Sequence, residues 1–315
     1  MTAGTPLPYV GVKPSREVAV EDESRRRKLQ DSDTLQGGDD RSVSPLEPEK
    51  PRRAFRVLAW ILSLWLLALS LFGLMELVLM WLSDEALSSM FGDEIPAIVS
   101  HRTHFMIIGI LAWSRVLSAF VQLRKPARRE APMLLLVAIA VGGAIVYALS
   151  GTVEEWVVEE LTILIPVLAL AWLHPGRARF GDNPGFDRPM VILAGVGALP
   201  WLVYAFENAR LQFLNVAGDP HAQMEHWATA ALMAVVIIAA GFLGSSRHQG
   251  WRLTAWIAAA GSALFGLHSL VFPGSASGLT AFWAWAAIAW GVVFAAATVR
   301  RSSTEKQSPL LERSA

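Results

Sequence analysis

Histidines and carboxylates lie near the ends of several apolar segments in this chain, and these side chains could bind a cation or exchange a proton. His101 and His104 are three residues apart, so they would project from one face of a helix. Glu225 precedes His226 directly, and His268 lies inside a later apolar run. Imidazole suits zinc, copper and iron, so a divalent metal site is one interpretation of these five residues. Ordinary hydrogen bonding of each histidine to water, hydroxyl or backbone groups is the alternative.

Two further arrangements of these residues are open. His221 and Glu225 would share a face if the helix that carries His226 extends back that far. His104 and His226, at equal depth on facing helices, could ligate a b-type haem. The chain has no cysteine, which excludes disulfides, Cys-ligated zinc, iron–sulfur clusters and covalent haem attachment. Any metal must therefore be held mainly by His, Glu or Asp.

Carboxylates suggest proton or cation binding. Glu155 and Glu159 are spaced i, i+4, and two such neighbours raise at least one pKa or chelate a divalent cation. Glu159 would lie about 8 Å inside a helix that starts near residue 154. Alternatively, the membrane helix starts near Leu161 and these acids lie in an external turn. Glu76 and Glu207 fall near the outer ends of two other apolar segments, and all four are candidate ion- or proton-binding residues.

Arg115 is a further candidate, because it falls close to the middle of an apolar segment. Its side chain could extend toward the nearer membrane surface. It could also pair with Glu76 or Glu159 inside the protein, which would indicate a gated or substrate-binding interior.

The elements that position these residues are apolar segments of about twenty residues, the length that crosses a bilayer. The 315-residue chain is 53% hydrophobic, with a mean hydropathy of +0.41. Its net charge of +0 gives no bulk basic field for nucleic acid. We therefore expect an all-α integral membrane protein of about eight transmembrane helices, with the lipid bilayer as its partner. The predicted spans lie near 57–82, 104–123, 132–150, 154–173, 189–208, 226–244, 253–272 and 280–299.

Charge alternates between the connecting loops. Every second loop is basic, with Arg52, Arg124, Arg177, Arg247 and Arg300 among its residues, and the intervening loops are acidic or neutral on balance. The positive-inside rule then places both termini in the cytoplasm. The excess of arginine over lysine and the many alanines indicate a GC-rich bacterium, hence a bacterial inner (plasma) membrane.

Three regions follow from this topology. Residues 1–53 are polar and charged, so we expect a disordered cytoplasmic tail. Residues 54–300 form the transmembrane domain, and 301–315 form a short cytoplasmic tail. Small residues recur every fourth position at Ala258–Gly266 and Ala287–Ala295, which favours close helix packing.

The two sets of four spans resemble each other. Glu76 and Glu207 end the first and fifth spans, and His104 and His226, each followed by an aromatic residue, open the second and sixth. Parallel halves related by an axis along the membrane normal would bring these residues together as a two-fold His/Glu constellation.

Four short segments resemble bacterial multi-span membrane proteins of unknown function, and this resemblance implies no activity. They are His101-Arg102-Thr103-His104, Leu173-His174-Pro175, Gly250-Trp251-Arg252-Leu253 and Ser269-Leu270-Val271-Phe272-Pro273. The ceramidase and adiponectin-receptor class of membrane hydrolases has a late HxxxH metal pair. His268 stands without such a partner, so residues of that class are not carried over.

Three functions remain open at this level. The first is proton- or cation-coupled transport of a small ion or molecule through a polar site in the outer half of the bundle. The second is a metal- or haem-binding membrane protein, which could be an oxidoreductase. The third is a non-catalytic scaffold, and homo-oligomerisation is open in each case. The chain has no Gly-x-Ser-x-Gly, His-Glu-x-x-His or P-loop signature.

Overall fold

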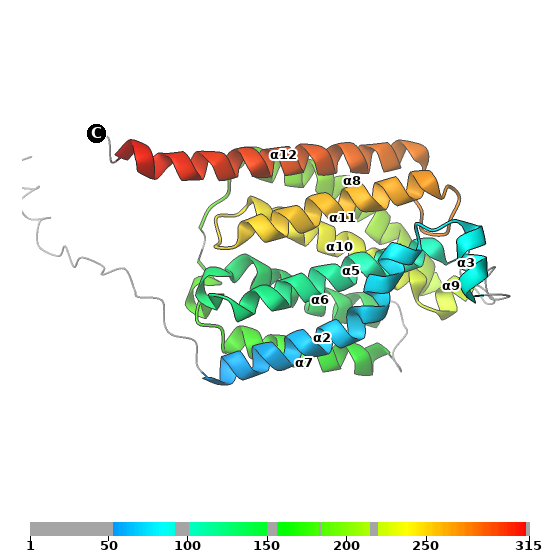
Figure 1. Ribbon diagram of the computed structural model, residues 1–315, viewed down its shortest axis with the longest axis horizontal. Helices are drawn as coiled ribbons and strands as arrows, with labels where there is room; N and C mark the ends of the chain where they lie inside the picture. Colours follow the sequence, from blue (N-terminus) through cyan, green and yellow to red (C-terminus); the bar gives the residue numbers. More distant parts are fainter. Residues whose placement is uncertain (1–52, 92–100, 150–155, 183, 215–219, 313–315) are drawn as a thin grey trace, which may run out of the picture. The chain divides into compact units, whose positions relative to one another are not determined.

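The computed structural model describes residues 53–91, 101–149, 156–182, 184–214 and 220–312, and this part of the chain is an all-α bundle (Figure 1). The expected tail, residues 1–52, lies outside the described residues. The fold class is confirmed. The helices are α2 (Arg53–Leu79), α3 (Asp84–Phe91), α5 (Arg102–Phe120), η2 (Val121–Leu123), η3 (Pro126–Arg128), α6 (Glu130–Leu149), α7 (Trp156–Trp172), η4 (Arg177–Arg179), α8 (Arg188–Leu214), α9 (Pro220–Gln223), α10 (His226–Ser245), α11 (Trp251–Val271) and α12 (Ala281–Glu312).

Each of the eight predicted spans corresponds to one long helix. Among the described residues, seven helices are long and apolar enough to cross a membrane, namely α2, α5, α6, α8, α10, α11 and α12. The eighth, α7, has 17 described residues, of which Leu161–Trp172 are apolar. The protein is therefore a multi-span membrane protein. Helix α12 continues to Glu312, so the expected C-terminal tail is helical over 301–312.

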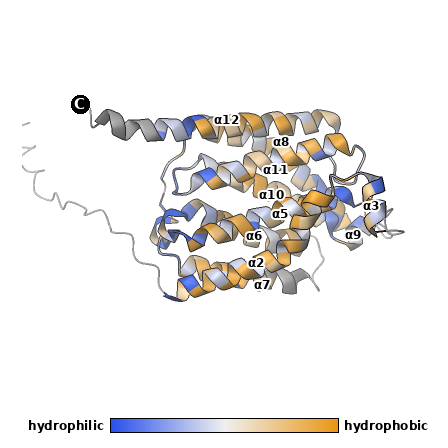
Figure 2. Ribbon diagram, in the orientation of Figure 1, coloured by the Kyte–Doolittle hydropathy of each residue, from blue (hydrophilic) through white to orange (hydrophobic). Residues whose placement is uncertain are grey.

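Burial divides the helices into a central and a peripheral set. In α10, 72% of the membrane-spanning window is buried, whereas the value for α12 is 28% and for α2 and α8 it is 33%. The peripheral helices expose large apolar side chains such as Leu199, Phe206 and Trp285. Hydrophobic residues cover these helices along their length, and hydrophilic residues gather toward their ends (Figure 2). Apolar exposure on this scale suits contact with lipid tails rather than water.

Helix packing repeats between the two halves of the chain. In the first half α2 packs on α5 and α6 packs on α7, and in the second half α8 packs on α10 and α11 packs on α12. The first and fourth helices of each half, α2 with α7 and α8 with α12, also touch. Helices α5, α6, α10 and α11 make most of the contacts between the halves, and α6 also touches α8. This order is the one expected of two parallel four-helix halves.

Small residues set the close approach of α11 and α12, as the four-residue spacing predicts. A Cβ atom on Gly266 would lie 2.6 Å from the carbonyl oxygen of Ala284, and one on Gly291 would lie 2.6 Å from that of Ala259. The hydroxyl of Ser262 donates to the carbonyl of Ala287 at 3.0 Å. The two backbones therefore meet without intervening side chains.

The arginine-rich loops gather at one end of the bundle, which we call the basic end. Buried Glu130 at the start of α6 accepts an ion pair from Arg179 Nε at 2.5 Å, and His248 Nδ1 lies 3.5 Å from its other oxygen. The backbone N–H of Ala131 donates to Gln249 in the α10–α11 loop. The guanidinium of Arg301 in α12 donates to three carbonyls at the end of α10. The basic loops thus lie at one end of the bundle, as their alternation along the chain predicts. Which end faces the cytoplasm stays a prediction.

Candidate metal-binding site

Three histidines from two distant parts of the chain meet at the end of the bundle opposite the basic end. One ring nitrogen each of His101, His221 and His226 lies within 4.8 Å of the other two. His226 is buried, and His101 and His221 are half-buried. The ring centroids of His101 and His226 are 4.7 Å apart. Among the described residues, this is the group whose donor atoms are close enough to share an ion.

His104 completes the histidine cluster, which we define as His101, His104, His221 and His226. Its ring is stacked on that of His226, with centroids 3.5 Å apart and planes 22° apart. Its Nδ1 atom is buried and makes no hydrogen bond within the described part of the chain. His101 is the N-cap residue of α5 and His104 lies in its first turn, and the rings of both contact the ring of His226.

An interruption between helices α9 and α10 positions the two histidines of the second half, His221 and His226. Glu225 has a left-handed backbone with φ of 58°, which is uncommon for a residue other than glycine. Helix α10 therefore begins at His226, and the short helix α9 carries His221 separately. The helix that carries His226 does not extend back to His221, so the condition under which His221 and Glu225 would share a face is not met. The break instead turns His221 back toward His226, with ring centroids 5.5 Å apart.

Gln212 of α8 holds this break in place. Its side-chain N–H donates to the carbonyl of Ala222 at 2.8 Å, and its oxygen accepts from the N–H of Ala228 at 3.2 Å. The side chain is fully buried, so both bonds form away from water. Gln212 thus joins the segment that precedes Glu225 to the first turn of α10.

Glu225 directly precedes His226 in the chain. The residue is only 4% exposed, so its side chain lies away from solvent. Its carbonyl accepts from the hydroxyl of Thr229 at 2.9 Å, and that hydroxyl lies 3.1 Å from the phenol oxygen of Tyr147. A buried carboxylate next to imidazoles is a common arrangement in metal sites, where it ligates or orients a histidine.

His268 lies outside the cluster. It is fully buried in α11, and its Nε2 atom lies 3.3 Å from the hydroxyl of Thr103. The rings of Trp81 and Phe272 flank it at 5.8 and 4.9 Å. Its role as a metal ligand finds no support in this arrangement, and the hydroxyl contact matches the structural alternative expected for it.

The candidate carboxylates do not join the cluster in the described structure. Glu207 is exposed and pairs with Arg210 at 3.2 Å, so it is not part of the buried group. The side chains of Glu76 in α2 and Glu159 in α7 lie outside the described residues, as does the whole of Glu155. Arg115 lies half-buried in α5. Their proposed roles in ion binding therefore stay predictions.

A b-type haem does not fit this histidine pair. A haem with two histidine ligands lies between them, so their rings approach from opposite faces of the macrocycle. The rings of His104 and His226 are stacked at 3.5 Å and leave no space for a porphyrin. We therefore derive nothing from haem chemistry at this pair.

A small cation does fit the cluster. Zinc binds imidazole nitrogen at about 2.0–2.1 Å in a tetrahedral arrangement, which places ligand nitrogens about 3.4 Å apart. The ring nitrogens of His101, His221 and His226 lie within 4.8 Å of one another, so ligation would require the side chains to draw together by no more than about 1.4 Å. Three imidazoles leave a fourth position, which water, a carboxylate or a substrate can occupy.

His221 is the residue that sequence reasoning underused. Its position before the sixth span placed it near Glu225 and His226, but the predicted ligand set did not include it. The signal was present, because Pro220 and His221 precede the span closely.

Comparisons with known protein families, with characterised proteins and with solved structures returned no match to this chain. The resemblance suggested by the four short segments therefore has no independent support. Any functional inference depends on the site.

Proposed function

We propose that this multi-span membrane protein binds a divalent transition-metal ion, with His101, His221 and His226 as the ligands. The observation that carries the proposal is the convergence of three imidazole nitrogens within 4.8 Å from segments 120 residues or more apart. Neutral imidazoles prefer zinc, copper, nickel and cobalt over magnesium or calcium, which favour oxygen ligands. Zinc is the ion that we would test first.

Burial of the site supports the same proposal. One imidazole of the cluster is buried and three are half-buried, and the buried Glu225 directly precedes His226 in the chain. Such groups are costly near a membrane and are usually functional. A bound cation would use the imidazole lone pairs, and the negative charge of Glu225 would offset part of its positive charge.

Zinc titration of metal-stripped protein without a polyhistidine tag tests the proposal. We expect one zinc ion per chain by elemental analysis. In calorimetry His221→Gln should weaken zinc binding by more than about 100-fold, beyond the roughly 10–100-fold of a residue that only orients a ligand. His248→Gln, which removes a histidine from the basic end, is the matched control and should leave the affinity unchanged. Equal zinc binding by wild type and His101→Gln/His221→Gln/His226→Gln would overturn the proposal.

Cation transport is a second candidate, favoured by the position of the cluster. His101 and His104 belong to the first half of the chain, and His221 and His226 belong to the second. Substrate sites at the interface between structural repeats are typical of transporters. Zinc uptake into proteoliposomes, followed with an internal fluorescent indicator, tests this candidate. Uptake that is lost in His221→Gln would support it, whereas zinc binding without uptake would leave a metal-binding protein that does not transport.

A further inference from the structure

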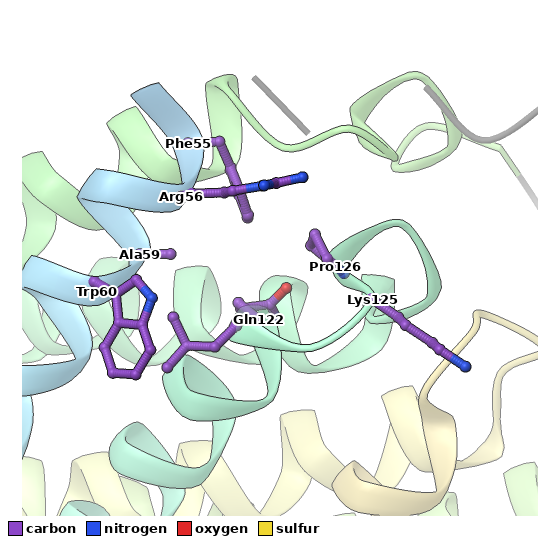
Figure 3. Close-up of a pocket in the computed structure, with 8 residues that line it drawn as sticks. Phe55, Arg56, Ala59, Trp60, Gln122, Lys125 and Pro126 are labelled. Carbon is purple, nitrogen blue, oxygen red and sulfur yellow. The ribbon is translucent and has the colours of Figure 1, made fainter. Parts of the chain in front are cut away.

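The basic end contains a cavity of about 310 Å³ between the start of α2 and the segment that follows α5. Arg56 and Trp60 line it from α2, and Gln122, Lys125 and Pro126 line it from the other side (Figure 3). It is separate from the histidine cluster, which lies at the opposite end of the bundle, so the inference below does not depend on the metal proposal.

The charge of this cavity is positive. Arg56 and Lys125 are its charged lining residues, and none of the described residues that line it is acidic. In Figure 3 the Arg56 side chain extends from α2 over the side of the cavity where Pro126 lies, whereas Lys125 extends away from it. Both side chains are exposed and able to move. An arginine fork binds phosphate oxygens in pairs, and a lysine adds a flexible point charge.

The polar wall of the cavity is rigid. Gln122 is buried, and its side-chain N–H groups donate to the carbonyls of Ser118 and Arg129. Its oxygen lies 3.2 Å from Nε2 of His174. Because these bonds occupy the amide, an anion in the cavity would be held by Arg56 and Lys125.

The depth of the cavity matches the headgroup layer of a membrane. The apolar span of α2 runs over Arg53–Leu71, so Arg56 lies in its first turn. Trp60 lies one turn further, is 54% exposed, and adjoins the exposed apolar side chains of Val57 and Ile61. Tryptophan is enriched at the membrane interface, with the acyl chains on one side and the headgroups on the other. The cavity thus has a cationic side toward the basic end and an apolar side that continues along the lipid-facing surface of α2.

We propose that this cavity binds the headgroup of an anionic phospholipid from the leaflet at the basic end. Arg56 and Lys125 pair with the phosphate oxygens, and the upper acyl chains lie along Trp60 and Ile61. Cationic pockets between transmembrane helices recognise lipid headgroups in this way.

Native mass spectrometry of the full chain in mild detergent, with phosphatidylglycerol or phosphatidylcholine added back, tests this proposal. Wild type should retain phosphatidylglycerol at least about tenfold better than phosphatidylcholine, and Arg56→Gln/Lys125→Gln should lose that preference. The control Arg128→Gln/Arg300→Gln removes two exposed arginines from the same end and should keep the preference for phosphatidylglycerol. Trp60→Ala should weaken retention of the lipid.

Two outcomes would overturn the proposal. If both double variants lose the preference for phosphatidylglycerol equally, only the total charge of the basic end matters. Displacement of the lipid by millimolar inorganic phosphate would assign the cavity to a free anion. Elution volume and melting temperature identify any variant that fails to fold, and Arg56→Lys then replaces it. This variant keeps the charge without the fork, so it should retain part of the preference.

Discussion

The imidazole rings of His104 and His226 are stacked 3.5 Å apart, and each residue lies at the start of the second helix of its half of the chain. Related residues of two parallel repeats can meet in this way only close to the axis between the halves. The contact is the one that the predicted two-fold constellation requires of its histidines, and the constellation itself stays a prediction. His226 also belongs to the three-histidine group, so the stack connects the repeat to the candidate metal site.

His104→Ala should weaken zinc binding, because the stacked ring of His104 restricts the orientation of His226. We expect a loss of about tenfold, at the lower end of the range for residues that orient a ligand. His104→Phe retains a stacking partner without a nitrogen, and should keep most of the affinity. If His104→Phe lowers the zinc affinity as much as His221→Gln does, His104 is itself a ligand. Calorimetric zinc titration separates these results.

Gln212→Leu should weaken zinc binding without removing a ligand. The substitution keeps a similar volume but breaks the bonds to Ala222 and Ala228 that hold the break before α10. We expect a loss of about 10–100-fold in zinc affinity. Buried groups left without partners should also destabilise the fold by about 1–3 kcal/mol. Gln122→Leu, a matched change of a buried glutamine at the basic end, should destabilise the protein without changing zinc affinity.

His174 should make stability depend on pH. Its Nδ1 accepts from the N–H of Gly176 at 3.0 Å, so Nε2 carries the proton and faces Gln122. Burial between Phe55 and Phe180 lowers the pKa of His174 from 6.5 to about 4. The backbone of Pro126 opposes this shift, and the charge of Arg179 adds a smaller lowering effect. Because the folded pKa is depressed, this histidine favours the folded state above pH 6.5. That contribution falls as pH drops from about 6.5 toward 4, by up to about 3 kcal/mol.

Thermal melting in detergent between pH 7 and pH 5 measures this effect. His174→Gln should melt at a lower temperature than wild type at pH 7. This difference in melting temperature should be smaller at pH 5, because wild type loses stability as His174 gains a proton and glutamine has no proton to gain. Other histidines titrate in both proteins, so their effects cancel in the difference. A gap that is constant with pH would contradict the assignment.

Gly197→Ala should destabilise the contact between α8 and α12. An added Cβ would lie 2.3 Å from the indole nitrogen of Trp290, which donates to the carbonyl of Leu193 at 2.8 Å. Overpacking of this kind costs about 1–3 kcal/mol. Gly195→Ala is the control two residues away. Its Cβ would meet no atom within 4 Å in the described structure, so the change should be neutral or stabilising by up to about 1 kcal/mol. Equal melting temperatures for the two variants would argue against this packing.

Arg301→Gln should loosen the end of α10. The guanidinium of Arg301 donates to the carbonyls of Gly244, Ser245 and Ser246, and it stacks 3.7 Å above the ring of Trp251. Loss of several charge-assisted bonds should lower stability by about 2–4 kcal/mol. Arg300→Gln is the matched control, because the neighbouring side chain is exposed. Hydrogen exchange at residues 244–246 should rise in Arg301→Gln alone.

Hydropathy and charge were sufficient to predict the helices and the sorting of their loops, because crossing a bilayer constrains both strongly. The small-residue spacing around Gly266 and Gly291 also indicated close helix packing, although it did not say that α11 and α12 would be each other's partners. These features depend on local composition, which the sequence contains in full.

The site was harder to predict because its geometry depends on single residues. Glu225 has a left-handed backbone although glutamate has no special preference for it, so the break before α10 had no local signal. In α8, the rotation of the helix about its axis decides which of the neighbouring side chains Glu207 and Asn208 is buried. Asn208 bonds to Tyr204 and faces Ser277, while Glu207 is exposed. Packing between distant helices sets that rotation, and periodicity alone did not resolve it.

A bound ion at the histidine cluster would act as a removable crosslink. Its ligands belong to both halves of the chain. At the basic end the two halves are already joined without an ion, because His248 of the second half lies 3.5 Å from the carboxylate of Glu130 in the first. At an ion concentration 100 times the Kd, occupancy adds about 2.7 kcal/mol to the ligated state. The availability of metal on the side of the membrane that this end faces would therefore set how firmly the two halves are held together there.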